Sequence, residues 1–223
     1  MKVFDLHIHT KLESTDSIID PDELVLEARR KGLDGLCVTE HGVTRSSVAS
    51  TLAKKYNFLV LGGFEASTEL GDVLIFGLDS IPRNIYRASE IKPLVEKAGG
   101  VMIVAHPFRS DFNRARILNQ LPVLNLAEAC GRKIFSLVDA MEVANGWTVE
   151  DDVNFCQQVS RNLGLKGTGG SDAHMISQVG CCVTIFNNGV EDEESFIREL
   201  KKGNFRAEDR RAREQKNPAY WCL

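Results

Sequence analysis

The sequence predicts an α/β fold in which a parallel sheet is covered by helices. Short apolar segments typical of strands alternate along the chain with longer segments whose apolar residues recur at helical spacing. About seven such strand–helix units follow one another, and repeated units of this kind build a parallel sheet. Their number favours a closed or nearly closed barrel, with an open, doubly wound sheet as the alternative.

The individual elements can be assigned in order along the chain. The helix that begins at Pro21, for example, follows the capping residue Asp20 and ends at Gly32. The predicted strands cover residues 3–7, 36–39, 58–61, 73–76, 101–105, 137–143, 165–168 and 180–186. The predicted helices cover residues 21–31, 46–55, 89–98, 149–163 and 191–202, with one or two more between 112 and 135 that are interrupted at Pro122.

Length and composition are those of an ordinary globular chain. The 223 residues suit a single domain, 1–223, in which residues 206–223 form a charged C-terminal tail that is either docked or frayed. Hydrophobic residues make up 43% and charged residues 26%, which excludes disordered, collagen-like and coiled-coil proteins. The formal net charge of −4 argues against binding of a long nucleic-acid duplex by charge alone.

The expected environment follows from what the sequence lacks. No segment approaches the ~20 consecutive apolar residues of a membrane span, and the start MKVFDLHIHT does not have the pattern of a signal peptide. We therefore expect a cytoplasmic protein with no membrane partner. The six cysteines show no CxxC spacing, so we expect reduced thiols that pack as small apolar groups rather than disulfides or a zinc site.

The placement of the histidines is the main functional signal. The chain has five, and a single histidine at a strand end is usually just a polar side chain. Here all five, with two carboxylates, fall at the C-terminal ends of predicted strands, where the loops of such folds converge to build sites. These residues are His7, His9, His41, Glu65, His106, Asp172 and His174.

Imidazole and carboxylate ligands without thiolate suit zinc, manganese or iron. The candidates outnumber the three or four ligands that one catalytic ion takes from a protein. We therefore expect two or three divalent ions, ~3.5–4 Å apart and bridged by carboxylates.

At these positions the sequence resembles the PHP (polymerase and histidinol phosphatase) family. The motifs are DLHIHT (5–10), TEHG (39–42), GGFEAS (62–67), AHPF (105–108) and GGSDAH (169–174). The resemblance implies a distorted, TIM-like (βα)7 barrel, a dinuclear or trinuclear metal centre and, usually, phosphoesterase activity. By position it implies two inner ions held by His7, His9, Glu65, His106, Asp172 and His174, and an outer ion held by Asp16 and His41, for which His174 is a candidate shared ligand.

Three positions leave the expected ligand set open. Leu74 occupies the place where the resemblance leads us to expect a further histidine of the family, so one ion is expected to bind more weakly. Glu40 stands where the family usually has aspartate. Glu13 is an alternative to Asp16 as the ligand of the outer ion.

The expected function is metal-dependent hydrolysis of a phosphate ester by a metal-bridging hydroxide. Asp172, His174 and Arg109 are the expected catalytic residues, and Arg109 is the first candidate to neutralise a bound phosphate, ahead of Lys11 and Arg45. The expected substrate is a small phosphomonoester, a nucleotide or an oligonucleotide end. An amidohydrolase-type C–N hydrolase and a non-catalytic metal-binding scaffold are the alternatives, and the oligomeric state is left open.

Overall fold

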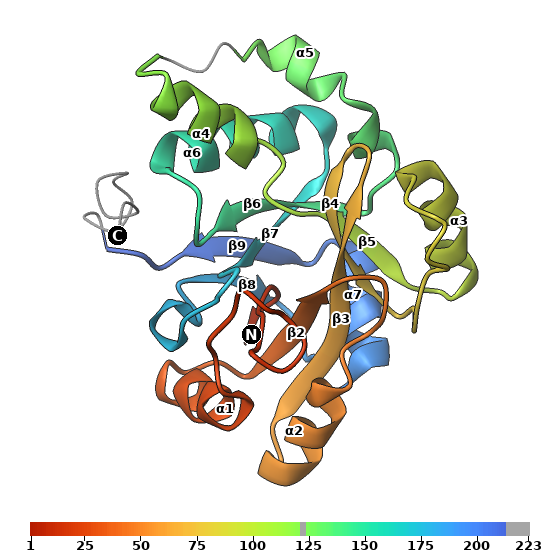
Figure 1. Cartoon of the computed structure of the whole chain (residues 1–223), viewed down its shortest axis with the longest axis vertical. Coiled ribbons are helices and arrows are strands. Elements are labelled where there is room, and N and C mark those ends of the chain that lie inside the picture. The colour runs from red at the N-terminus through yellow and green to blue at the C-terminus, as the bar shows by residue number, and fades with distance from the viewer. Residues whose placement is uncertain (121–123, 213–223) are drawn as a thin grey trace.

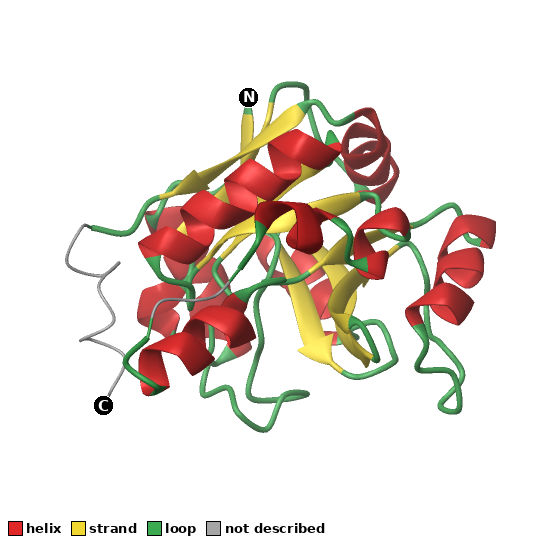
Figure 2. Cartoon of the chain, turned by 90° about the horizontal axis from the view of Figure 1, so that it is seen from above, coloured by secondary structure: helices red, strands yellow, loops and turns green. Residues whose placement is uncertain are grey.

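The computed structural model describes residues 1–120 and 124–212, and within them one nine-stranded sheet is surrounded by helices (Figures 1 and 2). The strands are β1 (Lys2–Asp5), β2 (Gly35–His41), β3 (Leu59–Thr68), β4 (Gly71–Phe76), β5 (Val101–Val104), β6 (Ala140–Asn145), β7 (Lys166–Gly170), β8 (Cys182–Phe186) and β9 (Phe205–Asp209). The helices are α1 (Pro21–Arg30), α2 (Val48–Tyr56), α3 (Ala88–Lys97), α4 (Arg109–Ile117), α5 (Leu126–Cys130), α6 (Glu150–Leu163) and α7 (Glu193–Lys202), with short 3₁₀ turns at Lys133–Ser136 and Ile176–Gln178.

The predicted elements are confirmed in place, with shifts at their ends. In α1 the Asp20 side chain accepts a hydrogen bond from the Asp22 N–H at 2.9 Å, as the capping pattern indicates. The segment expected to hold one or two helices holds α4, α5 and a 3₁₀ turn, and α4 begins earlier, at Arg109. The predicted interruption at Pro122 lies outside the described residues.

The sheet is only partly parallel, which corrects the expectation of a parallel sheet. Its strands are ordered β7-β6-β5-β4-β3-β2-β1-β8-β9. The parallel pairs are β1–β2, β2–β3, β5–β6 and β6–β7, whereas β4 runs antiparallel to both of its neighbours and β8 antiparallel to β1 and β9. The reason at β4 is the link of Glu69 and Leu70 between β3 and β4, which is long enough for a hairpin and too short for a crossover helix.

The sheet closes into a distorted, TIM-like barrel, as predicted. Beyond β1 and β7 the chain segments pair through a parallel bridge between Ile8 and Ala173. The His9 N–H donates to the Ala173 carbonyl at 3.0 Å, and the Ala173 N–H donates to the His7 carbonyl at 3.3 Å. Lower in the barrel, the Gly169 N–H donates to Thr184 Oγ1 at 2.8 Å and joins β7 to β8. The barrel seam therefore runs through the histidine segment itself.

The two faces of the sheet form separate cores. Successive strand residues point to opposite faces, so Leu74 and Phe76 lie in the barrel interior, while Val73 and Ile75 pack in a second core with residues of α3. Phe196 of α7 contacts Phe76 at 5.1 Å between ring centroids. Since Phe76 ends the antiparallel β4, α7 covers the end of the barrel opposite the histidines.

The C-terminal segment is docked over part of its length. Residues 205–209 form β9, which pairs with β8 from Phe186–Phe205 to Cys182–Asp209, and Arg211 beyond it is 6% exposed. Residues 213–223 lie outside the described part of the chain. All five described cysteines are free thiols, as expected, and Cys222 lies in the segment that is not described. Among the described helices, none has the length and apolar character needed to cross a membrane.

Candidate metal centre

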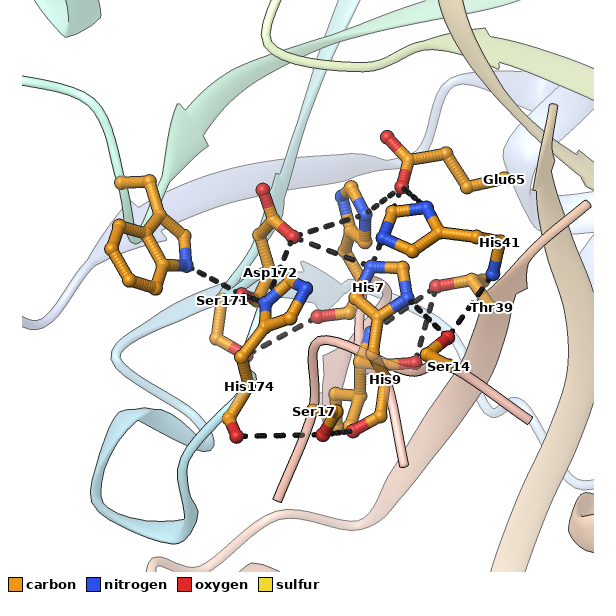
Figure 3. A network of polar contacts seen from close by, with 12 residues as sticks. His7, His9, Ser14, Ser17, Thr39, His41, Glu65, Ser171, Asp172 and His174 are labelled. Carbon is orange, nitrogen blue, oxygen red and sulfur yellow. Dashed lines mark hydrogen bonds and ion pairs between the residues drawn. The ribbon is translucent and has the colours of Figure 1, made fainter. Parts of the chain in front are cut away.

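The strand ends at one mouth of the barrel bring all five histidines together, and Figure 3 shows His7, His9, His41 and His174 among them. His7 and His9 follow β1, His41 ends β2, His106 follows β5 and His174 follows β7. Glu65 comes from β3 and Asp172 from the segment after β7. The ends of strands that run in the same direction meet at one end of a barrel, which is why residues 165 positions apart become neighbours.

The innermost group consists of two histidines and two carboxylates. His7 Nε2 lies 3.3 Å from Glu65 Oε2 and 3.5 Å from Asp172 Oδ1, and His9 Nε2 lies 3.4 and 3.3 Å from the same two oxygens. Both Nε2 atoms are buried and have no hydrogen-bond partner among the described residues. Buried nitrogens without partners, aimed at ionised oxygens, form a donor set that fits a divalent cation.

A second group lies further out, around His41. Its Nε2 is 3.0 Å from Asp16 Oδ2 and its Nδ1 is 3.0 Å from Glu65 Oε2, so Glu65 adjoins both groups. His174 Nε2 lies 3.3 Å from Asp16 Oδ2. The structure brings Asp16, and not Glu13, to these histidines, because Glu13 accepts a hydrogen bond from the Ser47 hydroxyl at 2.6 Å.

A third group contains a residue that the sequence analysis missed. His106 Nε2 lies 3.0 Å from Glu65 Oε1, and ligand atoms of Glu65, His106 and Asp72 lie within 4.8 Å of one another. The expectation about Leu74 is corrected, because its side chain is fully buried in the apolar barrel interior. Asp72 is two residues nearer the mouth on antiparallel β4 and shares its face. The sequence signal for Asp72 is an acidic residue at the start of the strand that follows the Glu65 motif. It indicates a ligand only if that strand is recognised as the second strand of a hairpin.

Glu142 holds two of the histidines from behind. Its Oε1 lies 3.2 Å from His7 Nδ1, its Oε2 accepts a hydrogen bond from the His106 N–H at 3.0 Å, and the Asn145 amide donates to Oε2 at 2.9 Å. A proton on His7 Nδ1 that is bound to Glu142 leaves His7 Nε2 as the free ligand atom. The residue therefore fixes both the ring orientation and the tautomer of His7.

Glu40 has a comparable role on the other side of the centre. It accepts hydrogen bonds from the Thr10 hydroxyl at 2.6 Å and from the Ser14 hydroxyl. Ser14 Oγ in turn lies 3.3 Å from His9 Nδ1 and accepts the His41 N–H at 3.2 Å. Glu40 thus anchors the loop after β1.

Two of the candidate ligands have unusual backbone conformations. His106 has a φ of +30° and Asp172 a φ of +53°, in the left-handed region that residues with a Cβ rarely adopt. Such a conformation costs on the order of 1–3 kcal/mol each. The Glu142 contact to the His106 N–H and the bridge beside Asp172 hold these residues in place.

Arg109 is the cation of the site. Its Nη1 donates to Asp172 Oδ2 at 2.6 Å, and its remaining N–H groups have no hydrogen-bond partner among the described residues. The two other predicted cations are paired: Lys11 with Asp20 at 2.6 Å, and Arg45, which lines a cavity beside His41, with Glu193 at 2.8 Å.

The charges at the centre are strongly coupled. Burial lowers the pKa of His7, but the carboxylates of Asp172, Glu65 and Glu142 outweigh it and raise that pKa well above its ordinary value. Burial lowers the pKa of His9 to about 4. Burial raises the pKa of Asp172, but the neighbouring His7, His9, His106 and Arg109 hold it well below the ordinary value. Burial raises the pKa of Glu65 too, but the neighbouring His7 holds it below the ordinary value. Asp172 and Glu65 are therefore ionised, and a bound cation would take the place of the proton on His7.

A cavity of about 610 Å³ opens beside the centre. His41 and Glu40 border it on the side of the histidines, and Thr44, Ser47 and Arg83 border it further away. The exposed Arg83 makes no ion pair within the described part of the chain. The cavity is large enough to take the remainder of a substrate whose reacting group lies at the histidines.

Known proteins that are similar to this chain include one sequence relative and two solved structures. The uncharacterized protein MJ1587 of Methanocaldococcus jannaschii is 28% identical over 162 residues, which is 67% of this chain and 85% of that protein. A two-domain protein from Bacteroides vulgatus, described as containing a predicted PHP-like metal-dependent phosphoesterase, has a TM-score of 0.70 at 20% identity and covers 93% of this chain and 64% of its own. An amidohydrolase from Chromobacterium violaceum, solved with bound sulfate and no metal, has a TM-score of 0.59 at 16% identity, with 95% and 99% covered.

At these identities the solved structures show a shared fold and nothing more. The family models show more than the fold, namely the family to which the chain belongs. The model described as the PHP domain matches residues 5–130, which include the first six candidate ligands of the predicted set, and the model described as PHP-associated matches residues 154–205. Since the first model alone covers more than half of the chain, the protein belongs to the PHP family.

Proposed function

We propose that the protein is a metal-dependent phosphoesterase that hydrolyses a small phosphate ester, a nucleotide or an oligonucleotide end. The observation that supports this most directly is the convergence of the unpartnered Nε2 atoms of His7 and His9 on oxygens shared with Glu65 and Asp172. An arginine with free donors stands at the edge of the same group. Together they offer ligands for cations and a binding group for a phosphoryl oxygen.

The ligands would divide among two or three divalent ions, with zinc, manganese and iron as the metals that suit them. His7, His9, Glu65 and Asp172 would hold one ion. Asp16, His41 and His174 would hold a second, and Glu65, Asp72 and His106 a third. Bound ions of this kind supply Lewis acidity and an activated water nucleophile.

The chain's own residues would orient the substrate and balance the negative charge of its phosphate. Arg109 would place its free N–H groups against the phosphoryl oxygens, where negative charge grows during the reaction. Asp172 holds the Arg109 guanidinium in position through the 2.6 Å contact to Nη1. His174 stands at the edge of the centre, 17% exposed, with Nδ1 2.9 Å from the Asp172 carbonyl, so its Nε2 would either hold an ion or, when it holds none, pass on a proton near the leaving group.

The cavity beside His41 would take the leaving group of the ester. Arg83 lines it together with two acids, Glu13 and Glu40, so a polar leaving group is favoured over an apolar one, and Arg83 offers the contact for a negative charge on it. A small phosphorylated molecule or a nucleic-acid end fits this cavity. The net charge of −4 gives no support for a long duplex as substrate.

C–N bond hydrolysis is the second candidate, because one structural neighbour is described as an amidohydrolase. A phosphate ester is preferred because Arg109 supplies a cationic contact that a neutral amide does not require.

The test is a substrate panel of phosphomonoesters, nucleotides, oligonucleotides with terminal phosphates, and amides. Each is assayed with Mn²⁺, Zn²⁺ and Fe²⁺ and with chelator as control. Phosphate release that requires metal and is lost in Arg109→Ala supports the proposal. Turnover of amides alone would favour the second candidate, and no turnover despite bound metal would indicate a scaffold.

A further inference from the structure

A buried arginine near the C-terminus contacts a loop that reaches the metal centre. Arg211 follows β9 and is 6% exposed. Its Nε and Nη2 atoms bind the two carboxylate oxygens of Asp209 at 2.9 and 2.8 Å, and its Nη1 donates to the carbonyls of Gly146, at 3.1 Å, and Thr148. A single guanidinium thus ties β9 to the loop after β6.

That loop carries two side chains which contact the candidate ligands. The Asn145 amide donates to Glu142 Oε2 at 2.9 Å and lies 3.3 Å from Asp172 Oδ2. The Trp147 indole N–H donates to the Asp172 carbonyl at 2.7 Å, and its ring lies edge-on to His174 at 6.0 Å between centroids. Residues 145–147 therefore hold both ends of the Asp172–His174 segment.

A shift of this loop on loss of Arg211 would be passed directly to the segment that carries Asp172. A Cβ at Gly146 would lie 2.1 Å from the Ser171 carbonyl oxygen, so the loop backbone is packed directly on the segment that leads to Asp172. The carbonyls of Gly146 and Thr148 would lose their shared donor in a buried place. Lysine is no substitute, because an ammonium cannot span two carbonyls and a carboxylate in one plane.

We propose that Arg211 is a positioning residue of the metal centre. It holds residues 145–148 so that Asn145 and Trp147 set Asp172 and His174 in the geometry that binds metal. Arg211 lies beyond the segments matched by the two family models, which end at residues 130 and 205, so the stretch after β9 contributes to the centre. This inference rests on the proposed metal binding.

The experiment compares Arg211→Lys and Arg211→Met with the wild-type chain. The matched control is Arg206→Met, which removes an exposed arginine that pairs with Glu208 at 3.0 Å on the same strand. Cobalt(II) is titrated into each metal-free protein, and its visible absorption reports ligand geometry. Trp147 fluorescence is followed in a Trp221→Phe background, since the chain has two tryptophans.

Both Arg211 variants are expected to bind at least one cobalt ion tenfold or more weakly, with an altered absorption spectrum and a shifted Trp147 emission. Arg206→Met is expected to stay within twofold of the wild type. In Arg211→Gly, millimolar guanidinium should restore part of the affinity.

Two results would overturn the proposal and are distinguishable. If the Arg211 variants keep the wild-type cobalt affinity and spectrum while the metal-free proteins melt at lower temperature, Arg211 serves stability alone. If the wild-type chain itself binds no cobalt, the proposed function fails and this inference fails with it.

Discussion

Glu65 and Asp172 share the same pair of imidazole nitrogens. One oxygen of each carboxylate lies within 3.5 Å of both His7 Nε2 and His9 Nε2. The two acids come from positions 107 residues apart in the chain, yet neither satisfies the histidines by a hydrogen bond. This arrangement of two negative oxygens around two imidazole nitrogens suits a divalent cation.

The purified protein is expected to bind at least two transition-metal ions per chain at neutral pH. The described residues form several overlapping ligand groups, each with three or more donors, and one ion cannot use all of these donors. Elemental analysis after saturation and desalting measures the stoichiometry. One ion or fewer per chain would contradict a multinuclear centre.

His7→Ala and Asp172→Ala are each expected to lower activity by at least about a thousandfold, because a lost ligand removes both an ion and the charge balance around it. Lys11→Ala is the control, since that lysine pairs with Asp20 at the surface. Circular dichroism checks that the folds are intact. Wild-type turnover in either ligand variant would show that the site is assigned wrongly.

Asp72→Asn is expected to weaken one ion-binding step by about tenfold, because Asp72 is the carboxylate beside Glu65 and His106 that faces the mouth. Leu74→His tests the opposite assignment. It should lower stability by about 2 kcal/mol, as an imidazole enters an apolar core, and should leave metal affinity unchanged. Calorimetric titration with Mn²⁺ distinguishes the two, and tighter binding in Leu74→His would restore residue 74 as a ligand position.

Asp152 is expected to make the metal-free protein less stable as the pH rises from about 4 to about 6, against the opposite contribution of His9, whose pKa burial lowers to about 4. Burial raises the pKa of Asp152 to about 6, and its Oδ2 has no partner among the described atoms. The unfolded chain has its ordinary pKa near 3.9, so within this window the folded state holds more protons and each step upward in pH costs stability. The total is on the order of 2–3 kcal/mol.

Asp152→Asn should remove most of this slope and raise the melting temperature above pH 7. Some slope should remain, because burial also raises the pKa of Asp5 to about 6. Thermal unfolding between pH 4 and 8 provides the comparison. If the pH dependence of stability is the same in the variant, Asp152 ionises in the folded protein without loss of stability, because another part of the chain contacts its carboxylate.

Arg83→Ala is expected to raise KM about tenfold for esters whose leaving group is negatively charged, and to leave kcat close to the wild-type value. The reason is that Arg83 lines the cavity beside His41 without an ion pair in the described structure. Arg87→Ala, an exposed arginine outside that lining, is the control. Equal effects of the two substitutions would argue that the cavity does not receive the leaving group.

The positions of the site residues could be predicted because their signal is local. A histidine at the end of an apolar run predicts both the strand and the place of its side chain, as at His7 and His106. The direction of β4 could not be read in the same way, since the short apolar run 73–76 is compatible with either orientation. That single uncertainty placed Leu74 at the mouth and concealed Asp72.

Contacts between distant segments were beyond the reach of sequence patterns. Arg211 looks like one more charge in a basic stretch, and only the fold shows that it is buried against residues 146 and 148. Glu13 and Asp16 are equivalent by spacing, and they differ because the loop after β1 turns one towards Ser47 and the other towards His41. Each of these outcomes depends on where a loop crosses a remote element, for which periodicity carries no information.

The bridge between Ile8 and Ala173 has a consequence for how the chain matures. It is flanked by His7 and His9 on one side and by Asp172 and His174 on the other. During synthesis the first two histidines leave the ribosome long before the segment that completes their centre, so the proposed metal site cannot be complete before the last third of the chain is made. A cation held across this junction would fasten the barrel, and the His9 and Ala173 amides should then exchange with deuterium more slowly in the loaded protein than in the metal-free one.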